Sequence, residues 1–362
     1  MSDGGAVAAG ERLKVGIVGF GRIGAEHAAW LRQCGGAEPA GAFDPTPARR
    51  ALAEQHDGLR TFDSLDALLG DASVQAVLIS TPTARHFEQA SAALRAGKHV
   101  MVEKPMALDA REAAALVDLA ERERRVLGVF HNRRWDLDYL TLCRAIASGT
   151  LGRVLNVESR IGQWASCVGP AAKEWRPGWR NEAGFGGGGL YDWGSHFLDQ
   201  LWRMMLPARP IRAFAQLRGN VWASDCDDLA RVCVDFDNGA VGLVEINTTT
   251  TRPLPRWHVD GTAGSAESPY SLAFDLQTWA RLTFTPAPGE GYGGDQQLDV
   301  VDPGGVLTEP IIWDRFASAT RGEGEPAVTA RSVLPTMILL DAARQSSQTG
   351  AAVPIDASGW TR

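Results

Sequence analysis

The sequence predicts an α/β protein of two domains, the first built on a doubly wound parallel sheet and the second an α+β domain with a largely antiparallel sheet. Three observations support this architecture. From residue 13 to residue 130, short apolar runs alternate with helical patterns, which is typical of βαβ units. A glycine-rich turn joins the first apolar run to the first helical pattern. Beyond residue 131, strand patterns separated by turns and glycines dominate.

The first domain is expected at residues 13–131, after a disordered lead-in at residues 1–12. Its expected strands are Leu13–Val18, Pro39–Phe43, Val74–Ile79, His99–Val102 and Val126–Phe130. Its expected helices are Ala25–Cys34, Ala48–His56, Ser64–Leu69 with Ser64 as N-cap, His86–Ala96 and Asp109–Arg122.

The second domain is expected at residues 132–362. Its expected elements are the helix Leu137–Ser148 and the strands Val154–Ile161, Ile211–Leu217, Leu229–Phe236, Ala240–Thr249 and Arg256–Val259. Asp237-Asn238-Gly239 is a hairpin signal, and Pro286–Gly305 is expected to be a long loop. A late helix at Ser332–Gln345 is a candidate to pack back on the first domain.

The chain of 362 residues is 44% hydrophobic and 22% charged, with a mean hydropathy of −0.14 and a net charge of −7. These values are ordinary for a soluble globular protein, and the acidic balance argues against a general nucleic-acid surface. No apolar run approaches the length of a membrane span, and the first twelve residues lack the features of a secretory signal. The five cysteines contain no Cys-x-x-Cys pair, so neither a disulfide framework nor a metal site is expected. We therefore expect a reduced, cytoplasmic protein.

The glycine-rich turn is Gly19-Phe20-Gly21-Arg22-Ile23-Gly24, between the first strand and the first helix. Strand, glycine turn and helix together indicate a dinucleotide-binding (Rossmann) unit. Gly19 permits the tight turn, Gly21 lets a pyrophosphate approach the backbone, and Gly24 lets the helix pack against the strand. The helix N-terminus then offers N–H groups and a positive dipole end to the phosphates.

Asp44 ends the second strand, about 20 residues beyond the turn, where a carboxylate can accept hydrogen bonds from the adenosine ribose. A carboxylate at this place repels a 2′-phosphate and favours NAD over NADP. Arg49 and Arg50 follow on the same loop or the next helix, so NADP is disfavoured rather than excluded. The alternative is that Asp44 merely caps a helix.

Glu103-Lys104-Pro105 follows the expected strand His99–Val102. Ligands of open parallel sheets bind at the carboxyl ends of the strands. Lys104 is therefore placed to stabilise a developing alkoxide, or to orient a substrate hydroxyl or the cofactor ribose. For the tripeptide taken alone, the alternative is a solvent-exposed lysine beside a turn proline.

Asp192 and His196 follow a run of four glycines, Gly186–Gly189. If a helix begins at Leu190, the two residues are four apart and share one face. A histidine supported by a carboxylate suits general-base work near neutral pH. Two alternatives stay open: a solvated pair on a helix face, and a metal pair, although no further ligands at suitable positions are evident.

An aromatic and basic stretch precedes these residues. Its members are Trp164, Lys173, Trp175, Arg176, Trp179 and Arg180, with Trp193 just beyond. Tryptophan stacks on sugar rings, while arginine and lysine donate to hydroxyls or acids, so Trp164, Trp175 and Arg180 are candidate substrate contacts. For any single tryptophan, packing in a core or an interface is the alternative. The histidines His27, His56, His99 and His258 are expected to be structural.

These elements together resemble the Gfo/Idh/MocA family of NAD(P)-dependent oxidoreductases along nearly the whole chain. The motifs that carry the resemblance are the glycine turn, Ser80-Thr81-Pro82 with His86, Ala96–Val100 leading to Glu103-Lys104-Pro105, and Gly188-Gly189 followed by Asp192, Gly194, His196 and Asp199. The spacing of Asp192 and His196 in that glycine setting is the specific part, because many families share the glycine turn.

The resemblance implies that Lys104, Asp192 and His196 form the catalytic set. His196 would take a proton from a secondary alcohol while hydride passes to nicotinamide. Lys104 would hold the reacting oxygen, and Asp192 would position and tune the other two. As cofactor contacts, the resemblance adds to the glycine turn, Asp44 and Arg49 the residues Ser80, Thr81, Pro82, His86, Glu103 and Lys104. It also places Arg133 where relatives contact substrate or cofactor.

The resemblance further implies an open-faced sheet in the second domain whose outer face forms a homodimer or homotetramer. Substrates in the family are mainly sugars, sugar acids, cyclitols and glycosides. The segment from Gln163 to Phe185 departs from the family pattern and leaves the substrate's identity open. We expect NAD as cofactor, a small carbohydrate or cyclitol as substrate, no metal, and neither a nucleic-acid nor a membrane partner.

The expected function is hydride transfer between nicotinamide and a secondary ring hydroxyl of a sugar, glycoside or cyclitol. Two alternatives stay open. A redox-neutral enzyme would oxidise a glycoside to a keto-sugar, eliminate the glycosidic bond and regenerate its cofactor within one cycle. A non-catalytic NAD-binding regulator on the same fold would be favoured if Lys104 or His196 were missing, but both are present.

Overall fold

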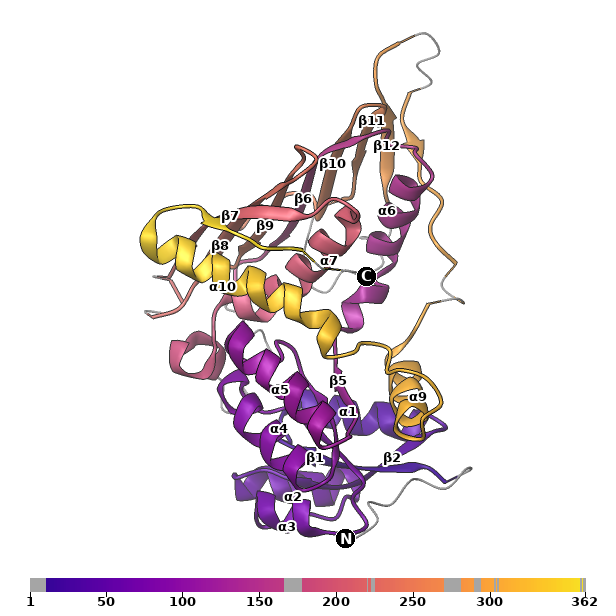
Figure 1. Cartoon of the computed structure of the whole chain (residues 1–362), viewed down its shortest axis with the longest axis vertical. Coiled ribbons are helices and arrows are strands. Elements are labelled where there is room, and N and C mark those ends of the chain that lie inside the picture. Colours follow the sequence, from indigo (N-terminus) through magenta and orange to yellow (C-terminus); the bar gives the residue numbers. More distant parts are fainter. Residues whose placement is uncertain are drawn as a thin grey trace. The chain divides into compact units, whose positions relative to one another are not determined.

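The computed structural model describes residues 11–165, 178–219, 221–222, 225–269, 281–289, 294–302, 304, 306–358 and 360. The chain divides into two compact units (Figure 1). The first comprises the described residues up to Asn132 together with Leu307–Leu334, and the second comprises the remaining described residues. The candidate substrate contact Trp175 lies outside the described residues, as do residues 1–10 of the expected lead-in.

The first unit is built on a five-stranded parallel sheet in the order β2-β1-β3-β4-β5. Its strands are β1 (Leu13–Val18), β2 (Ala37–Phe43), β3 (Ala76–Ile79), β4 (His99–Val102) and β5 (Leu127–Val129). Strands β3 and β4 are buried throughout, because a parallel sheet is covered by helices on both faces. The predicted doubly wound sheet is confirmed.

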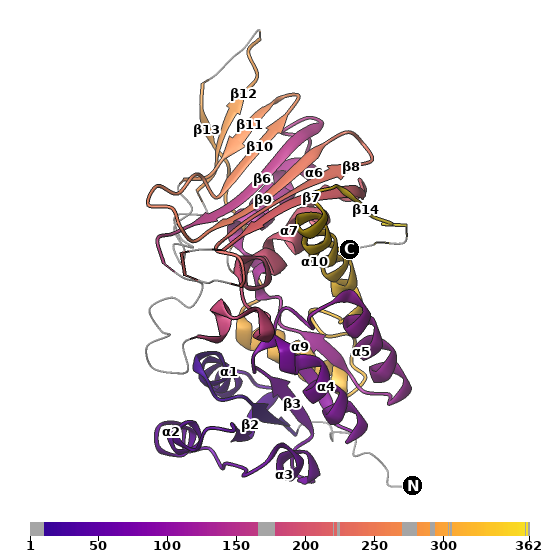
Figure 2. The same ribbon diagram turned by 90° about the vertical axis from the view of Figure 1, so that its left-hand side faces the viewer.

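The helices of the first unit are α1 (Arg22–Gln33), α2 (Pro47–Asp57), α3 (Leu65–Gly70), α4 (His86–Arg95), α5 (Ala110–Arg122) and α9 (Glu309–Thr320). In Figure 2, α1 lies on one side of β3 and α4 lies on the other. Ser64 caps α3 as predicted, because its Oγ accepts the Ala67 N–H at 3.0 Å. The sequence did not predict α9, which joins this unit through Asp314, whose Oδ1 accepts the Gly36 N–H at 2.6 Å.

The carboxyl edge of this sheet is held together one residue beyond the strands. The Ser80 N–H donates to the Val18 carbonyl and the Glu103 N–H to the Ile79 carbonyl, both at 2.9 Å. The Gly19 N–H likewise donates to the Phe43 carbonyl at 2.8 Å. Residues that the sequence places at strand ends are therefore fixed by the sheet's own hydrogen bonds.

The second unit is built on a nine-stranded sheet in the order β13-β12-β11-β10-β6-β9-β8-β7-β14. Its strands are β6 (Val154–Gly162), β7 (Pro210–Arg218), β8 (Leu229–Phe236), β9 (Val241–Asn247), β10 (Trp257–Gly261), β11 (Gly264–Glu267), β12 (Thr283–Pro286), β13 (Gln296–Gln297) and β14 (Val353–Pro354). All described pairs are antiparallel except β6 with β9. The predicted hairpin joins β8 to β9, with Gly239 at φ +84°. The predicted loop Pro286–Gly305 is wrong in part, because it contains β13.

Three helices of the second unit lie on one face of this sheet: α6 (Leu137–Ala147), α7 (Ser195–Met205) and α10 (Leu334–Thr349) (Figure 1). The late helix was a candidate to pack on the first domain. This helix packs on β7 of the second unit, where the Ser346 hydroxyl accepts the Ala215 N–H at 2.9 Å; its packing on the first domain stays a prediction. The segment that returns to the first unit is the one containing α9.

Candidate active site

The glycine turn in the first unit has the geometry of a phosphate cradle. Gly19 has φ +92°, a left-handed conformation that favours glycine. A Cβ on Gly24 would lie 2.2 Å from the Gly19 carbonyl oxygen, so α1 approaches the turn as closely as only glycine allows. A Cβ on Gly21 would meet no atom within 4 Å, so this position faces open space. Gly21 caps α1 without a side-chain hydrogen bond, and the turn therefore fits a dinucleotide pyrophosphate at the helix N-terminus.

Arg22 and Ile23 begin α1, and Arg22 Nη1 lies 2.6 Å from Glu26 Oε1 on the next helical turn. The Arg22 side chain is substantially exposed. Arg22 is thus the first residue of α1, directly after Gly21 of the cradle.

Asp44 ties the end of β2 to the glycine turn. Its carboxylate is buried, and Oδ2 accepts the Phe20 N–H at 2.9 Å while Oδ1 accepts the Thr46 N–H at 2.8 Å. Arg49 Nη1 lies 3.6 Å from Asp44 Oδ2. The N-cap of α2 is Thr46 rather than Asp44, so the helix-capping alternative for Asp44 is wrong.

Ser80, Thr81 and Pro82 follow β3 at the same edge. The Ser80 hydroxyl donates to the Gly19 carbonyl at 2.8 Å and so fixes the cradle. His86 is 1% exposed, with Nε2 2.9 Å from the Thr81 carbonyl oxygen and Nδ1 2.8 Å from the Pro105 carbonyl oxygen. Burial lowers the pKa of His86. Because both ring nitrogens face main-chain oxygens, this geometry favours a supporting role for His86 over direct polar contact with a cofactor.

Glu103 and Lys104 leave the end of β4, as the sequence predicts. Glu103 Oε1 lies 2.8 Å from His27 Nε2, and Glu103 Oε2 accepts the Lys104 N–H at 3.1 Å. Burial alone would raise the pKa of Glu103, but the His27 hydrogen bond and the Lys104 ammonium hold it below its usual value. Sequence reasoning treated His27 as structural and missed this contact, because 76 residues separate the two side chains.

Asp192 and His196 lie on consecutive turns of different geometry in the second unit. Leu190–Gly194 is π-helical, and α7 begins at Ser195. The helix expected from Leu190 therefore opens with a wider turn, so the regular i, i+4 argument does not apply to this pair. Single π-helical turns are frequent at functional sites. His196 itself is buried in the first turn of α7.

Asp227 binds the start of this π-helical turn. The sequence did not point to Asp227 as a residue of the site. Its Oδ2 accepts the Leu190 N–H at 2.8 Å, and its carbonyl accepts the Gly189 N–H at 3.0 Å. A Cβ on Gly188 would lie 2.3 Å from Asp227 Oδ1, so the glycine run is what admits the carboxylate. Burial raises the pKa of Asp227 to about 6.

Two arginines border the π-helical turn. Arg180 Nε lies 3.5 Å from Asp192 Oδ1, and the Arg133 guanidinium lies 4.7 Å from the centre of the Trp193 ring. The second unit thus brings two predicted substrate contacts, Arg133 and Arg180, to Asp192 and its neighbour. The predicted contact Trp164 is 56% exposed and meets Trp222 edge-on, with 5.4 Å between ring centres.

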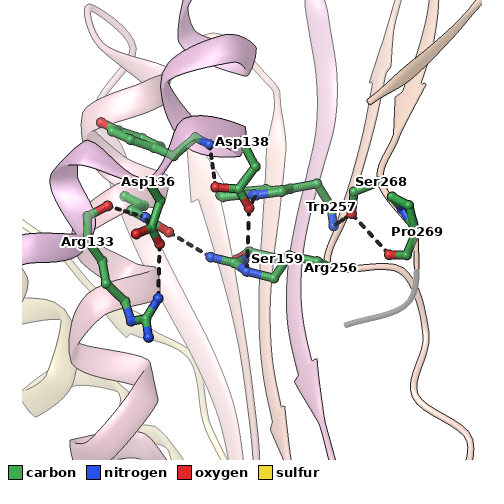
Figure 3. A network of polar contacts seen from close by, with 10 residues as sticks. Arg133, Asp136, Asp138, Ser159, Arg256, Trp257, Ser268 and Pro269 are labelled. Carbon is green, nitrogen blue, oxygen red and sulfur yellow. Dashed lines mark hydrogen bonds and ion pairs between the residues drawn. The ribbon is translucent and has the colours of Figure 1, made fainter. Parts of the chain in front are cut away.

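A buried polar network supports Arg133 and α7 (Figure 3). Gln200 of α7 donates to the Arg133 carbonyl at 2.6 Å and accepts from Arg256 Nη2 at 2.8 Å. Arg133 Nη1 donates to Asp136 Oδ2 at 3.2 Å. The Arg256 guanidinium lies 3.7 Å from the centre of the Phe197 ring. Main chain and side chain of Arg133 are therefore both held.

A second contact fixes α7 from the other direction. Asp199 accepts two hydrogen bonds from Arg134, at 2.7 and 2.8 Å, and one from the Thr336 hydroxyl of α10 at 2.8 Å. Such bidentate arginine–carboxylate pairs fix orientation as well as distance. The helix that carries His196 is therefore firmly anchored.

Two kinds of feature are absent from the described residues. Among them, no group of three or more histidine, cysteine, aspartate or glutamate side chains is arranged to hold a metal ion. No helix in the described part of the chain is both long and apolar enough to cross a membrane.

Comparison with known families matches both parts of the chain. Residues 13–131 match the model described as "Oxidoreductase family, NAD-binding Rossmann fold". Residues 139–267 match the model described as "GFO/IDH/MocA C-terminal domain".

Individual relatives agree with these matches. The uncharacterized oxidoreductase YdgJ of Escherichia coli (strain K12) is 35% identical over 294 residues, which covers 78% of this chain and 81% of YdgJ. A 1,5-anhydro-D-fructose reductase of Ensifer adhaerens is 29% identical, covering 94% of this chain and 98% of the relative. A crystal structure of an NAD-binding protein from Listeria innocua superposes with a TM-score of 0.83 at 29% identity, covering 95% of this chain and 97% of that one.

Proposed function

Because this chain belongs to the Gfo/Idh/MocA family of NAD-binding oxidoreductases, we propose that it transfers hydride between nicotinamide and a secondary ring hydroxyl of a sugar, glycoside or cyclitol. The observation that carries the proposal is the carboxyl edge of the parallel sheet. There the phosphate cradle, Asp44 and Glu103 with Lys104 are joined by hydrogen bonds of the sheet and of the side chains.

In the oxidising direction the roles divide as follows. NAD, when bound, supplies the hydride acceptor for the carbinol carbon. His196 accepts the hydroxyl proton as general base. Lys104 holds the reacting oxygen and stabilises its developing negative charge. Asp192 orients these two groups, and the carbinol becomes a carbonyl.

Three side chains of the second unit support a carbohydrate as substrate. Arg133 and Arg180 supply guanidinium donors suited to hydroxyl or acid oxygens. Trp164 presents an exposed aromatic face suited to a sugar ring. A relative named 1,5-anhydro-D-fructose reductase supports a carbohydrate as substrate.

We further propose that NAD is preferred over NADP. The Asp44 carboxylate repels a 2′-phosphate, and Arg49 lies close enough to this carboxylate to be attracted to it rather than to a phosphate. The expectations of a homodimer or homotetramer, of a cytoplasmic location and of the domain limits rest on the sequence and its family resemblance, and they remain predictions.

The experiment is an NADH absorbance assay with NAD and a panel of cyclitols, aldoses, uronic acids and aryl glycosides, repeated with His196→Ala. We expect turnover with one substrate class and a loss of about 10²-fold or more in the variant, the typical contribution of a general base. Failure of every substrate with both NAD and NADP, despite measurable cofactor binding, would contradict the proposal and favour a regulator. Release of aglycone without net NADH would instead favour the redox-neutral glycoside-cleaving enzyme.

A further inference from the structure

Three side chains from three elements form a series of hydrogen bonds that ends at the Lys104 main chain; two of them are fully buried, and Glu103 is 13% exposed. Trp313 belongs to α9, His27 to α1, and Glu103 follows β4. The Trp313 indole N–H donates to His27 Nδ1 at 3.1 Å, and His27 Nε2 lies 2.8 Å from Glu103 Oε1. All of these residues belong to the first unit.

The first contact settles which nitrogen of His27 carries the proton. An indole N–H can only donate, so His27 Nδ1 must present its lone pair to Trp313. The proton of the neutral ring is then on Nε2, which donates to Glu103. A doubly protonated ring would turn a second N–H against the indole donor. Trp313 therefore selects one tautomer of His27, and that tautomer suits Glu103.

The His27 ring has little freedom to turn away from this arrangement. It is fully buried. Trp30 and Phe130 pack against it edge-on, with ring centres at 4.8 and 4.3 Å. The hydrogen bond to Glu103 is therefore held by packing as well as by Trp313.

Glu103 links His27 to the main chain of Lys104. One carboxylate oxygen faces His27, and the other accepts the Lys104 N–H at 3.1 Å. A carboxylate with its proton removed can accept at both oxygens, whereas a protonated carboxyl loses part of that capacity. On the other side of Lys104, the carbonyl of Pro105 faces His86 Nδ1 at 2.8 Å. The backbone on both sides of Lys104 is thus tied to a buried histidine.

We propose that Trp313 and His27 are positioning residues: by holding Glu103 as an acceptor, they fix the Lys104 backbone and aim its ammonium at the reacting oxygen. This inference rests on the proposed function of Lys104. It assigns a task in the reaction to a histidine and a tryptophan that lie 286 residues apart and that no sequence motif connects.

The first test reads His27 itself and needs no turnover. In protein labelled with ¹⁵N-histidine, the His27 signals are identified by their loss in His27→Gln. We expect the neutral ring to be a single tautomer with the proton on Nε2, because the indole N–H occupies Nδ1. In Trp313→Phe, which removes the indole N–H, we expect a mixture of tautomers. A wild-type ring that carries its proton on Nδ1, or a Trp313→Phe ring with an unchanged tautomer, overturns the proposal.

The second test separates positioning from stability through kinetics. His27→Leu removes the donor to Glu103, and we expect kcat to fall about tenfold or more, as for a lost hydrogen bond to a charged group. Without that donor Glu103 gains protons more readily, so the acidic limb of the kcat profile should move to higher pH. In His27→Gln the amide N–H replaces Nε2–H. We expect kcat and its pH dependence in this variant to lie close to the wild-type values. The KM for NAD should change less than kcat in both variants.

His99→Leu is the matched control. His99 is also buried, and it lies at the amino end of the same strand, where its Nδ1 accepts the Val126 N–H at 3.0 Å. This variant should lose thermal stability while kcat and the pH profile stay unchanged. Equal losses of kcat in His27→Leu and His99→Leu, or no recovery in His27→Gln, overturn the proposal. A wild-type protein without turnover would instead contradict the proposed function. The ¹⁵N test would still decide whether the hydrogen bonds from Trp313 to His27 and from His27 to Glu103 exist.

Discussion

Asp44 is a single carboxylate with an observed role in the fold and a proposed role in cofactor choice. It accepts main-chain N–H groups from Phe20 and Thr46 and lies beside the Arg49 guanidinium. An asparagine would keep one oxygen acceptor and lose the negative charge. One of the two main-chain N–H groups would then lose its acceptor, but this structural loss affects both cofactors, so the ratio of their kcat/KM values reports the effect of the charge.

We predict that Asp44→Asn shifts the ratio of kcat/KM for NADP to that for NAD upward by about tenfold or more. The reason is that the repulsion of the 2′-phosphate is lost, together with the attraction that draws Arg49 toward the Asp44 carboxylate. Steady-state kinetics with both cofactors measure the ratio. Asp63→Asn, which removes a charge from an exposed side chain, is the control and should leave the ratio unchanged. An unaltered ratio in Asp44→Asn would show that Asp44 does not select the cofactor.

At the scale of elements, the sequence predicts features that depend on neighbouring residues in the chain, such as the limits of single strands. β1, β4 and β8 have the predicted limits, because apolar runs bounded by glycines and polar residues define short strands. The residues at the carboxyl edge follow from those limits and from parallel topology. The position of the candidate residues at this edge could therefore be predicted without a structure.

The parts that the sequence did not predict depend on contacts between distant segments. Asp227 supports the π-helical turn from 37 residues away. Helix α9 begins at Glu309 and joins a unit whose last strand ends at Val129. No spacing rule connects such segments. The π-helical turn itself arises where the glycine run lets Asp227 come close, and helical periodicity does not reveal it.

For this element we predict that Asp227→Asn becomes more stable, relative to the wild type, as pH rises. The folded pKa of about 6 lies above the ordinary value of about 4. The native carboxyl therefore holds its proton more tightly than the unfolded one, and the wild type loses stability from about pH 4 to about pH 6. The variant lacks this loss, which amounts to about 2 to 3 kcal/mol when complete.

Denaturant unfolding of both proteins from pH 4 to pH 7.5 measures this difference. Asparagine keeps an oxygen for the Leu190 N–H, so the turn is retained. Two results would contradict a burial-raised pKa for Asp227. One is a difference in the free energy of unfolding that stays constant across this range, and the other is a variant that becomes less stable than the wild type as pH rises.

At the scale of the whole molecule, the proposed reaction draws on both units. Lys104 belongs to the first unit, whereas Asp192 and His196 belong to the second. The first unit supplies the phosphate cradle and the fixed backbone around Lys104. In the proposal the second supplies His196 as general base on an anchored helix, with Arg180 beside Asp192. The central claim is that these two sets of residues serve one reaction.

A double-mutant cycle of Lys104→Ala and His196→Ala tests this claim most directly, with kcat/KM measured for the substrate that the panel identifies. We predict that each single variant loses about 10² to 10⁴ in rate and that the double variant loses little more than the worse single one, because residues that act as a unit are strongly non-additive. If the two losses multiply, or if either single variant keeps wild-type activity, the two units do not share the reaction as proposed.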